Sequence, residues 1–472
     1  MRRIAAVALL LACQPTTMPP PLGDTDGGGT QLTGPAGCAF ASNAFALPSM
    51  AAVSGAPFDG LTGHVACASS SRSFDYQLLD LTGDGLPDLL VTSACDDANV
   101  GTTSWRVYPN QGSAFGAPLS FALPVLSATP GCVASVAADV DGDLKADLVV
   151  TSLCTDVSVG TTRWLVYAND GSGFSATATP FALPQGYTNG SFPSLEVDTA
   201  TCTAGHPAYG FFDATKDGKP DLVVTTACDD VNVGVDHWRV YAGSGTGVGD
   251  AVSFPLPGGA VFASPRGGTM SCSATGFSTP TYSVVDFDGD FVPDLVVSQS
   301  CSDPGAGTTH WSVYADDGTR FSATPTSVSL PIFSNTPNGA FDSLYGSTPC
   351  TTGTASLVHG LADVDGDYKP DLVVLQSCSD ASVGVSAWDV YRNGGTSFGN
   401  GSAYELPLEL GLSASAPATS FGNSLACSGN VGAAAFQAAY LIGAPLDLVV
   451  TQSCSDATVG VSRWLTFAAS CP

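Results

Sequence analysis

The stretch Asp80-Leu81-Thr82-Gly83-Asp84-Gly85-Leu86-Pro87-Asp88 decides how this chain folds, because versions of it occur five times. The other four begin at Asp139, Asp213, Asp286 and Asp363, and every copy runs directly into Leu-Leu-Val or Leu-Val-Val. Oxygen side chains at loop positions 1, 3, 5 and 9, with a backbone carbonyl at position 7, supply the roughly six to eight oxygen ligands that Ca²⁺ takes. The sequence therefore predicts about five calcium ions per chain.

The predicted metal ligands share these five loop positions, with position 7 contributing its carbonyl oxygen. They are Asp80, Thr82, Asp84, Leu86 and Asp88; Asp139, Asp141, Asp143, Lys145 and Asp147; Asp213, Thr215, Asp217, Lys219 and Asp221; Asp286, Asp288, Asp290, Val292 and Asp294; and Asp363, Asp365, Asp367, Lys369 and Asp371. Because Thr82 and Thr215 replace an aspartate at position 3, their loops are expected to bind the ion most weakly.

The alternative calcium motif, the EF-hand, closes its loop with a bidentate Glu at position 12 between two helices. Position 12 is Val in all five copies, and the residues around it form a β-branched run. Such a run is typical of a strand, so each loop is predicted to connect two strands.

Each loop belongs to a longer unit that recurs six times. A Cys follows the last loop Asp by seven residues, an Asp comes two residues after that Cys, and a Trp comes ten residues after it. A run ending in Leu-Pro completes the unit, which therefore contains four strands. Four-stranded antiparallel units repeated radially are the blades of a β-propeller, so the predicted fold is an all-β, six-bladed propeller.

The sixth unit keeps Cys454 and Trp464 but has lost its loop carboxylates. Our alignment places Ala439, Leu441 and Gly443 at positions 1, 3 and 5, which leaves only Asp447 at position 9. We therefore expect metal binding in five of the six units.

The two ends of the chain complement each other. The sixth unit stops at Cys471, before its outer strand, while an isolated Leu47-Pro48 follows Cys38 near the start. The N-terminal strand is therefore predicted to complete the last blade, which leaves no break in the ring.

The cysteines predict a disulfide in every blade. Six of them follow the post-loop strands and six precede the loops, so that each pair faces the other across one hairpin. The predicted pairs are Cys67 with Cys95, Cys132 with Cys154, Cys202 with Cys228, Cys272 with Cys301, Cys350 with Cys378 and Cys427 with Cys454, plus a closing pair of Cys38 with Cys471.

Cys13 is left over from these seven pairs. It follows a positively charged start and a short apolar run, and Leu10-Leu11-Ala12-Cys13 is similar to the lipobox of bacterial lipoproteins. We expect residues 1–12 to be a signal peptide, Cys13 to carry lipid, residues 13–36 to be a flexible Pro/Gly/Thr tether, and residues 37–472 to form the propeller. The expected location is the bacterial cell envelope, at the outer membrane or cell surface, with a monomeric protein anchored by lipid.

The charge of −28 at pH 7 follows largely from the loops, since 18 of the 42 acidic residues are loop aspartates. Five bound Ca²⁺ would reduce it to about −18. Only 14 Lys and Arg are present. This balance excludes nucleic acid as a partner, because phosphate binding requires basic patches.

The Trp, the second set of repeated Asp and the five His are the other residues that could form a binding site. The blade Trp residues fit a repeated core position better than a set of sugar platforms. The Asp that follows each blade Cys is expected to cap the next turn rather than to form an acidic binding ring. The five His are expected to be exposed, and none has a Glu or Cys partner at metal-site spacing.

The loops resemble the FG-GAP and VCBS repeats of integrin α-subunit propellers, of FG-GAP-type lectins and of many secreted bacterial proteins. The aspartates at positions 1, 5 and 9 match in all five loops. The chain departs from the family at position 6, where Leu144, Phe291 and Tyr368 stand in place of the usual Gly while position 4 is Gly.

The resemblance implies a calcium-binding propeller that acts as a binding or adhesion module for a glycan or a protein surface. A carbohydrate is the leading candidate for this ligand. Two alternatives stay open, a propeller-type hydrolase or lyase and a purely structural surface protein. No nucleophile motif stands out in the sequence, so no catalytic residue is predicted. We expect ligand specificity in the variable segments between each Leu-Pro and the next Cys.

Overall fold

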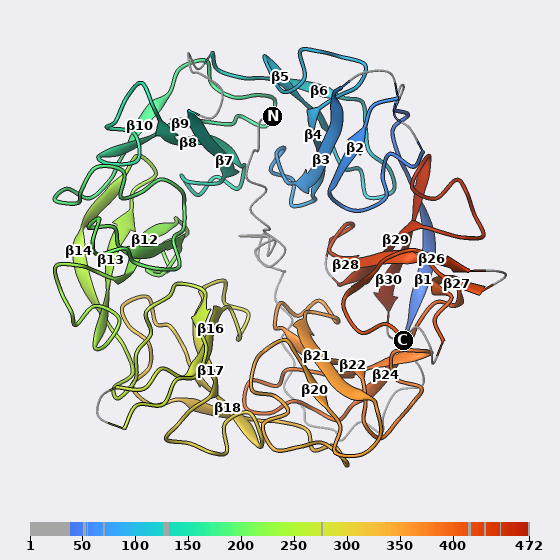
Figure 1. The fold of residues 1–472 in the computed structure, drawn as a ribbon. Helices are drawn as coiled ribbons and strands as arrows, with labels where there is room; N and C mark the ends of the chain where they lie inside the picture. Colours follow the sequence, from blue (N-terminus) through green and yellow to red (C-terminus); the bar gives the residue numbers. More distant parts are fainter. Residues whose placement is uncertain are drawn as a thin grey trace, which may run out of the picture.

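The computed structural model describes residues 38–50, 53, 55–68, 71–125, 132–274, 277–413, 417–428, 431–443 and 445–470. These residues form an all-β ring of six blades, which confirms the predicted fold (Figure 1). The expected signal peptide, lipidation site and tether lie outside the described residues.

Blades 1 to 3 follow one another along the chain. Blade 1 consists of β2 (Gly63–Ala66), β3 (Ser73–Leu79), β4 (Asp88–Ser93), β5 (Ser104–Tyr108) and β6 (Leu119–Ala122). Blade 2 consists of β7 (Val133–Ala138), β8 (Asp147–Leu153), β9 (Arg163–Tyr167) and β10 (Thr179–Ala182). Blade 3 consists of β11 (Ala208–Phe212), β12 (Asp221–Thr226), β13 (His237–Gly243) and β14 (Val248–Pro255).

Blades 4 to 6 complete the ring. Blade 4 consists of β15 (Gly267–Gly268), β16 (Thr281–Val285), β17 (Asp294–Gln299), β18 (His310–Tyr314) and β19 (Thr326–Ser329). Blade 5 consists of β20 (Gly346–Pro349), β21 (Ser356–Ala362), β22 (Asp371–Gln376), β23 (Ala387–Tyr391) and β24 (Ser402–Glu405), followed by the 3-10 turn η1 (Leu408–Leu410). Blade 6 consists of β25 (Gly422–Asn423), β28 (Ala435–Ala439), β29 (Asp447–Gln452), β30 (Arg463–Ser470) and β1 (Cys38–Ala46), beside a small hairpin of β26 (Ala426–Ser428) and β27 (Val431–Ala433).

The strand after each acidic loop is the most buried strand of its blade. In β4 the side chains of Leu89, Leu90 and Val91 are all fully buried, although alternate residues of a strand point to opposite faces. Both faces of the blade are therefore covered by neighbouring blades. The described core accordingly divides into six clusters, each shared by two adjacent blades.

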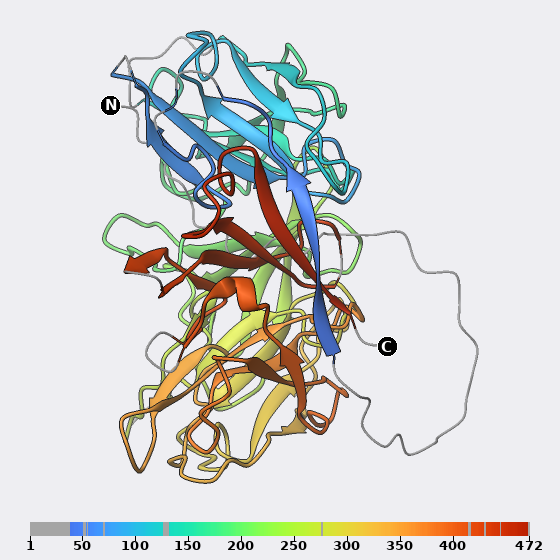
Figure 2. The same cartoon turned by 90° about the vertical axis from the view of Figure 1, so that its right-hand side faces the viewer.

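The N-terminal strand closes the ring as predicted. β1 pairs antiparallel with β30 from Ala39↔Ser470 to Ala46↔Arg463, and its Phe45 is buried against Trp464. β1 also makes a short parallel pairing with β24 of blade 5. Figure 2 shows the blue β1 lying along the red strands of the C-terminal blade. The start and the end of the propeller are thereby joined in one blade.

The Leu-Pro pairs lie just beyond the outer strands. β6 ends at Ala122, β10 at Ala182 and β24 at Glu405, each directly before its Leu-Pro. The backbone of the Leu still bonds to the neighbouring segment of its blade, since the Leu123 N–H donates to the carbonyl oxygen of Thr103, directly before β5, at 2.8 Å. The proline thus occupies the first position where no ladder hydrogen bond is needed.

Five of the predicted disulfides are present, each within one blade. They are Cys67–Cys95, Cys132–Cys154, Cys202–Cys228, Cys272–Cys301 and Cys350–Cys378, with Cα–Cα distances of 5.0 to 5.7 Å. Cys454 is also disulfide-bonded. The side chains of Cys38 and Cys427, and the whole of Cys471, lie outside the described residues, so these two pairings stay predictions.

Candidate metal centres

The aspartate at loop position 1 shapes the turn. In the second loop, Asp139 accepts hydrogen bonds from the N–H groups of Gly142 at 2.8 Å and Leu144 at 2.8 Å. The equivalent Asp80 accepts from Gly83 and Gly85. These bonds draw the backbone of the loop around the carboxylate at position 1.

Position 6 keeps this turn geometry even where glycine is absent. Leu144, Phe291 and Tyr368 have φ values of 73°, 69° and 67°, in the left-handed region that Gly85 also adopts. This conformation costs a non-glycine residue roughly 1–2 kcal/mol. In blades 4 and 5 the side chains offset part of this cost, because the rings of Phe291 and Tyr368 pack across the blade boundary with centroids 5.4 Å apart.

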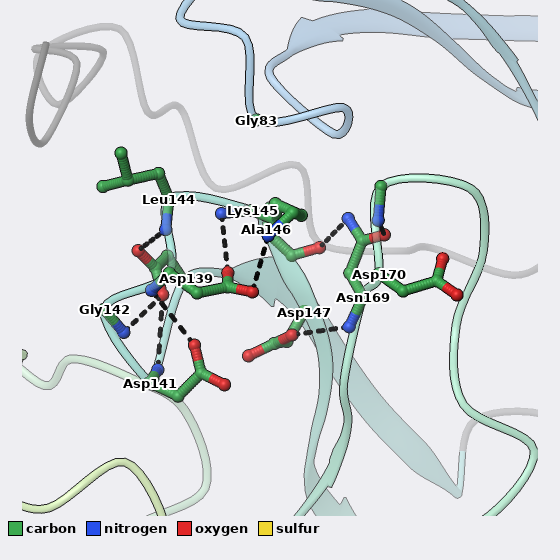
Figure 3. A network of polar contacts seen from close by, with 12 residues as sticks. Gly83, Asp139, Asp141, Gly142, Leu144, Lys145, Ala146, Asp147, Asn169 and Asp170 are labelled. Atoms are coloured by element: carbon green, nitrogen blue, oxygen red, sulfur yellow. Dashed lines mark hydrogen bonds and ion pairs between the residues drawn. The ribbon is translucent and has the colours of Figure 1, made fainter. Parts of the chain in front are cut away.

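Three of the five loops bring carboxylates together as a cation would require. The groups are Asp139, Asp141 and Asp147; Asp286, Asp288 and Asp290; and Asp363, Asp365 and Asp371, each with one oxygen per residue within 4.8 Å of the others. These are the three loops that carry Asp at position 3. Figure 3 shows Asp139, Asp141 and Asp147 gathered at the mouth of the second loop.

Asp147 offers the best test of whether these residues fit a metal ion. It is fully buried, and its Oδ1 accepts the Asn169 N–H at 2.8 Å. Its Oδ2 is buried without a hydrogen-bond partner, and burial raises the pKa of this carboxyl to about 7. A buried, uncompensated carboxylate oxygen beside two further carboxylates is the environment that a bound cation would satisfy.

The two loops with threonine at position 3 are arranged differently. Asp88 accepts the N–H groups of Leu81 and Thr82 at 2.9 Å, and the Thr82 hydroxyl donates to it at 3.4 Å. Thr215 makes the same contacts with Asp221. The position-2 N–H also donates to the position-9 carboxylate in the loops of blades 4 and 5. The contacts specific to the two threonine loops are therefore those from the N–H and the hydroxyl of the threonine, and weaker metal binding by these loops stays a prediction.

The sixth loop is one residue shorter than our alignment assumed. Ala439 pairs with Asp447 as Leu79 pairs with Asp88, so Ala439 precedes the loop and Tyr440 occupies position 1. The alignment of Ala439, Leu441 and Gly443 with positions 1, 3 and 5 was therefore wrong. The Tyr440 hydroxyl instead accepts the N–H of Asp363, the first residue of the fifth loop, at 2.9 Å.

Three asparagines that the sequence analysis did not single out connect the loops to one another. Asn110, Asn169 and Asn393 each lie 22 residues after a position-9 aspartate and donate a backbone N–H to it. Their side-chain amides donate to a carbonyl of the preceding blade's loop at 2.7 to 2.8 Å, and to the position-8 carbonyl of their own loop at 3.1 to 3.3 Å. Their constant spacing from the loop is the signal that could have revealed them.

A lysine links the third and fourth loops. Lys216 stands at position 4, where the other four loops have Gly, and adopts a φ of 60°. Its ammonium contacts the Asp290 carboxylate of the fourth loop. A positive charge of the protein itself therefore touches one of the three candidate metal centres.

The opposite end of the blades carries the second set of repeated aspartates. Each accepts the N–H two residues further on at 2.8 to 3.0 Å, as expected for turn caps: Asp97, Asp156, Asp230, Asp303, Asp380 and Asp456.

The six Trp are at most 9% exposed and belong to the core. Our expectation of exposed histidines holds only for His64, since His206, His237 and His310 are half-buried. His359 is buried in β21 against Phe341, and its Nε2–H donates a hydrogen bond to the Ser343 carbonyl oxygen at 2.9 Å.

Comparison with known proteins supports the repeat assignment. Residues 80–150 match the family model of the FG-GAP-like repeat. A search of curated proteins found no match. Among the described residues, no helix has the length and apolarity needed to cross a membrane.

Several solved structures are similar at low identity. A Photorhabdus luminescens Tc holotoxin pore structure aligns with a TM-score of 0.44 and 21% identity over 83% of this chain and 14% of that chain. An Agrocybe aegerita lectin, described as recognising non-reducing terminal N-acetylglucosamine, aligns with a TM-score of 0.35 and 18% identity over 71% of this chain and 67% of that one. A Penicillium chrysogenum α-L-arabinanase aligns with a TM-score of 0.33 and 12% identity over 90% of this chain and 98% of that one. This chain thus spans about one seventh of the toxin chain, and these likenesses carry no argument about function.

Proposed function

We propose that this protein is a calcium-stabilised propeller, anchored to the bacterial envelope through lipid on Cys13, that acts as a monomeric binding or adhesion module for carbohydrate. The observation that carries the calcium part is the convergence of three carboxylates in each of three loops, together with the unpartnered buried oxygen of Asp147. Ca²⁺ is the cation that suits such all-oxygen sites.

Calcium would act on the ring as well as on single loops. Each loop contacts its neighbour, as Asn169 does with Leu81 and Tyr440 with Asp363. An ion that fixes one loop therefore fixes the surface on which the next loop packs. Anything that binds only the folded state adds to its stability, so ion binding would raise the melting temperature.

A surface cavity of about 410 Å³ in blade 4 supports a small polar ligand. Its lining includes the 60% exposed ring of Phe277 and the side chains of Ser273, Ser278, Ser300 and Ser302. An aromatic wall with a few hydroxyl groups is suited to orienting a polar ligand such as a sugar. Of the lining, Gly259 and Ala260 belong to the segment between Leu256-Pro257 and the next Cys, Cys272, where we expected specificity, and the five residues named above lie beyond it.

A glycan array probed with the soluble part of the chain, in Ca²⁺ and in EDTA, tests whether the ligand is a carbohydrate. The proposal predicts binding to a defined set of glycans that depends on Ca²⁺ and is lost in Phe277→Ala. Ile332→Ala, which truncates an 89% exposed side chain outside the cavity, should bind normally. Absence of glycan binding under both conditions would favour a protein ligand or the purely structural alternative.

The anchor needs its own test, because Cys13 lies outside the described residues. Cys13→Ser should move the protein from the membrane fraction to the soluble fraction if the lipid on this sulfur is the sole attachment. Retention of the variant in the membrane fraction would contradict lipid anchoring at Cys13.

A further inference from the structure

Blade 4 breaks the pattern that joins the loops, because Asp316 stands where blades 1, 2 and 5 have asparagine. Its backbone N–H donates to Asp294 Oδ1 at 3.0 Å, as the Asn393 N–H donates to Asp371 Oδ1 at 2.9 Å. Its Oδ1 accepts the Gly318 N–H at 2.7 Å, as Asn393 Oδ1 accepts the Gly395 N–H at 2.9 Å. The backbone and one side-chain oxygen are therefore held in the same way in both blades.

The second carboxylate oxygen of Asp316 consequently takes the place of the asparagine Nδ2. In blade 5 that nitrogen lies 2.8 Å from the Phe287 carbonyl oxygen of blade 4 and 3.3 Å from the Pro370 carbonyl oxygen. The equivalent carbonyls in blade 4 are those of Ala214, in the third loop, and Pro293. By this equivalence Asp316 Oδ2 is placed to face both carbonyl oxygens, and no amide N–H is present to join the three oxygens.

The surroundings of Asp316 do not relieve this arrangement. The side chain is 5% exposed, and its Oδ2 is buried without a hydrogen-bond partner. The nearby carboxylates are those of Asp294, Asp317 and Asp290. Lys216 lies in the vicinity, but its ammonium contacts Asp290. A bare carboxylate oxygen facing two carbonyls is costly unless a positive charge joins them.

We propose that the junction of blades 3 and 4 is a further cation site, in which Asp316 Oδ2 and the carbonyl oxygens of Ala214 and Pro293 bind a calcium ion. Oxygens about 3 Å apart can share an ion bound at roughly 2.3–2.6 Å from each of them, with water completing the shell. The ion replaces the asparagine amide as the bridge between two blades. With a single carboxylate, this site fills at a higher calcium concentration than the loops.

Calcium equilibrium dialysis of the purified full chain, with the free ion raised to saturation, tests this site. Asp316→Asn introduces the amide that three blades already carry, so it should fold and should bind one ion fewer than the wild type. Asn393→Asp creates the blade 4 arrangement in blade 5 and should bind one ion more. The comparison is between variants, so the difference of one ion is informative even if the loops bind fewer ions than proposed.

A melting experiment in EDTA gives a second readout. Asp316→Asn should melt above the wild type there, because the amide bonds both carbonyls without an ion, and its melting temperature should rise less on addition of Ca²⁺. Equal ion counts for the wild type and Asp316→Asn would overturn the proposal whatever their melting temperatures. Failure of Asn393→Asp to fold in EDTA, with recovery in Ca²⁺, would support it.

Discussion

The side-chain amide of Asn169 in blade 2 donates a hydrogen bond to the carbonyl oxygen of Leu81 in the acidic loop of blade 1, at 2.7 Å. The two residues are 88 positions apart in the sequence and both are fully or nearly fully buried. The same amide bonds Ala146 of its own loop. One side chain thus couples the loops of two blades, so the loops behave as parts of a ring.

Replacing this amide should destabilise the propeller. Asn169→Ala leaves two buried carbonyl oxygens without a donor, at an expected cost of roughly 1–3 kcal/mol. The control is Asn232→Ala, which removes an exposed side chain at the other end of blade 3 and should change stability by less than about 0.5 kcal/mol. Denaturant unfolding measures both. Equal stability of the two variants would show that the Asn169 bridge contributes nothing.

Removal of the closing strand should disrupt the ring. Deleting residues 38–48 removes the partner of β30 and the buried Phe45, and exposes an unpaired strand edge in blade 6. We expect a lower melting temperature and aggregation on size-exclusion chromatography. Deletion of residues 14–36 alters only the expected tether and should have neither effect. A truncated protein that melts and elutes like its parent would contradict ring closure by β1.

Stability in the absence of metal should fall as the pH rises. Burial raises the pKa of Asp147, Asp294 and Asp371 to about 7, against about 4 in an unfolded chain. Between these values the folded state holds protons that the unfolded state has released, so the free energy of unfolding decreases across this window. In EDTA the melting temperature should be higher at about pH 5 than at about pH 8. Saturating Ca²⁺ favours the ionised carboxylates, so it should abolish or reverse this difference in melting temperature. If the melting temperature depends on pH in the same way with and without Ca²⁺, that result would count against metal in these loops.

Lys216 should weaken calcium binding at the fourth loop. Its ammonium contacts Asp290 and must be displaced or repelled when an ion enters. Lys216→Gly restores the residue found at position 4 elsewhere and also relieves the positive φ. A partly exposed pair of this kind is worth roughly 0.2–1 kcal/mol, so the affinity of this loop should rise about 1.5- to 5-fold. Calorimetric titration measures it, with Arg320→Gln as the charge-matched control, which breaks an exposed pair with Asp317. An equal gain in calcium affinity in Lys216→Gly and Arg320→Gln would show that the overall charge, and not the Lys216 contact, sets the affinity.

The repeated features of this fold could be predicted because they recur at fixed spacing. The loop aspartates, the blade cysteines and the Trp residues each mark the same place in every hairpin, so their periodicity specifies the blades and the five observed disulfides. The split last blade followed from Leu47-Pro48, a strand ending that had no unit of its own.

The remaining features depend on contacts that spacing does not encode. Asn169 is read as a turn residue until the loop of another blade is placed against it. The deletion in the sixth loop changes which residue stands at position 1, and only the pairing of Ala439 with Asp447 reveals it. The burial of His359 likewise follows from the packing of Phe341 over β21. In each case the deciding contact joins segments that no local pattern connects.

Metal analysis of the purified protein tests directly whether the propeller is built around calcium. After equilibration with Ca²⁺ and removal of free ion, we expect about five ions in the loops. In a separate measurement at saturating calcium, we expect one more ion at Asp316. At limiting calcium the loops of blades 2, 4 and 5 should fill before those containing Thr82 and Thr215. A protein that retains no ion, or only one, would contradict a propeller built around calcium.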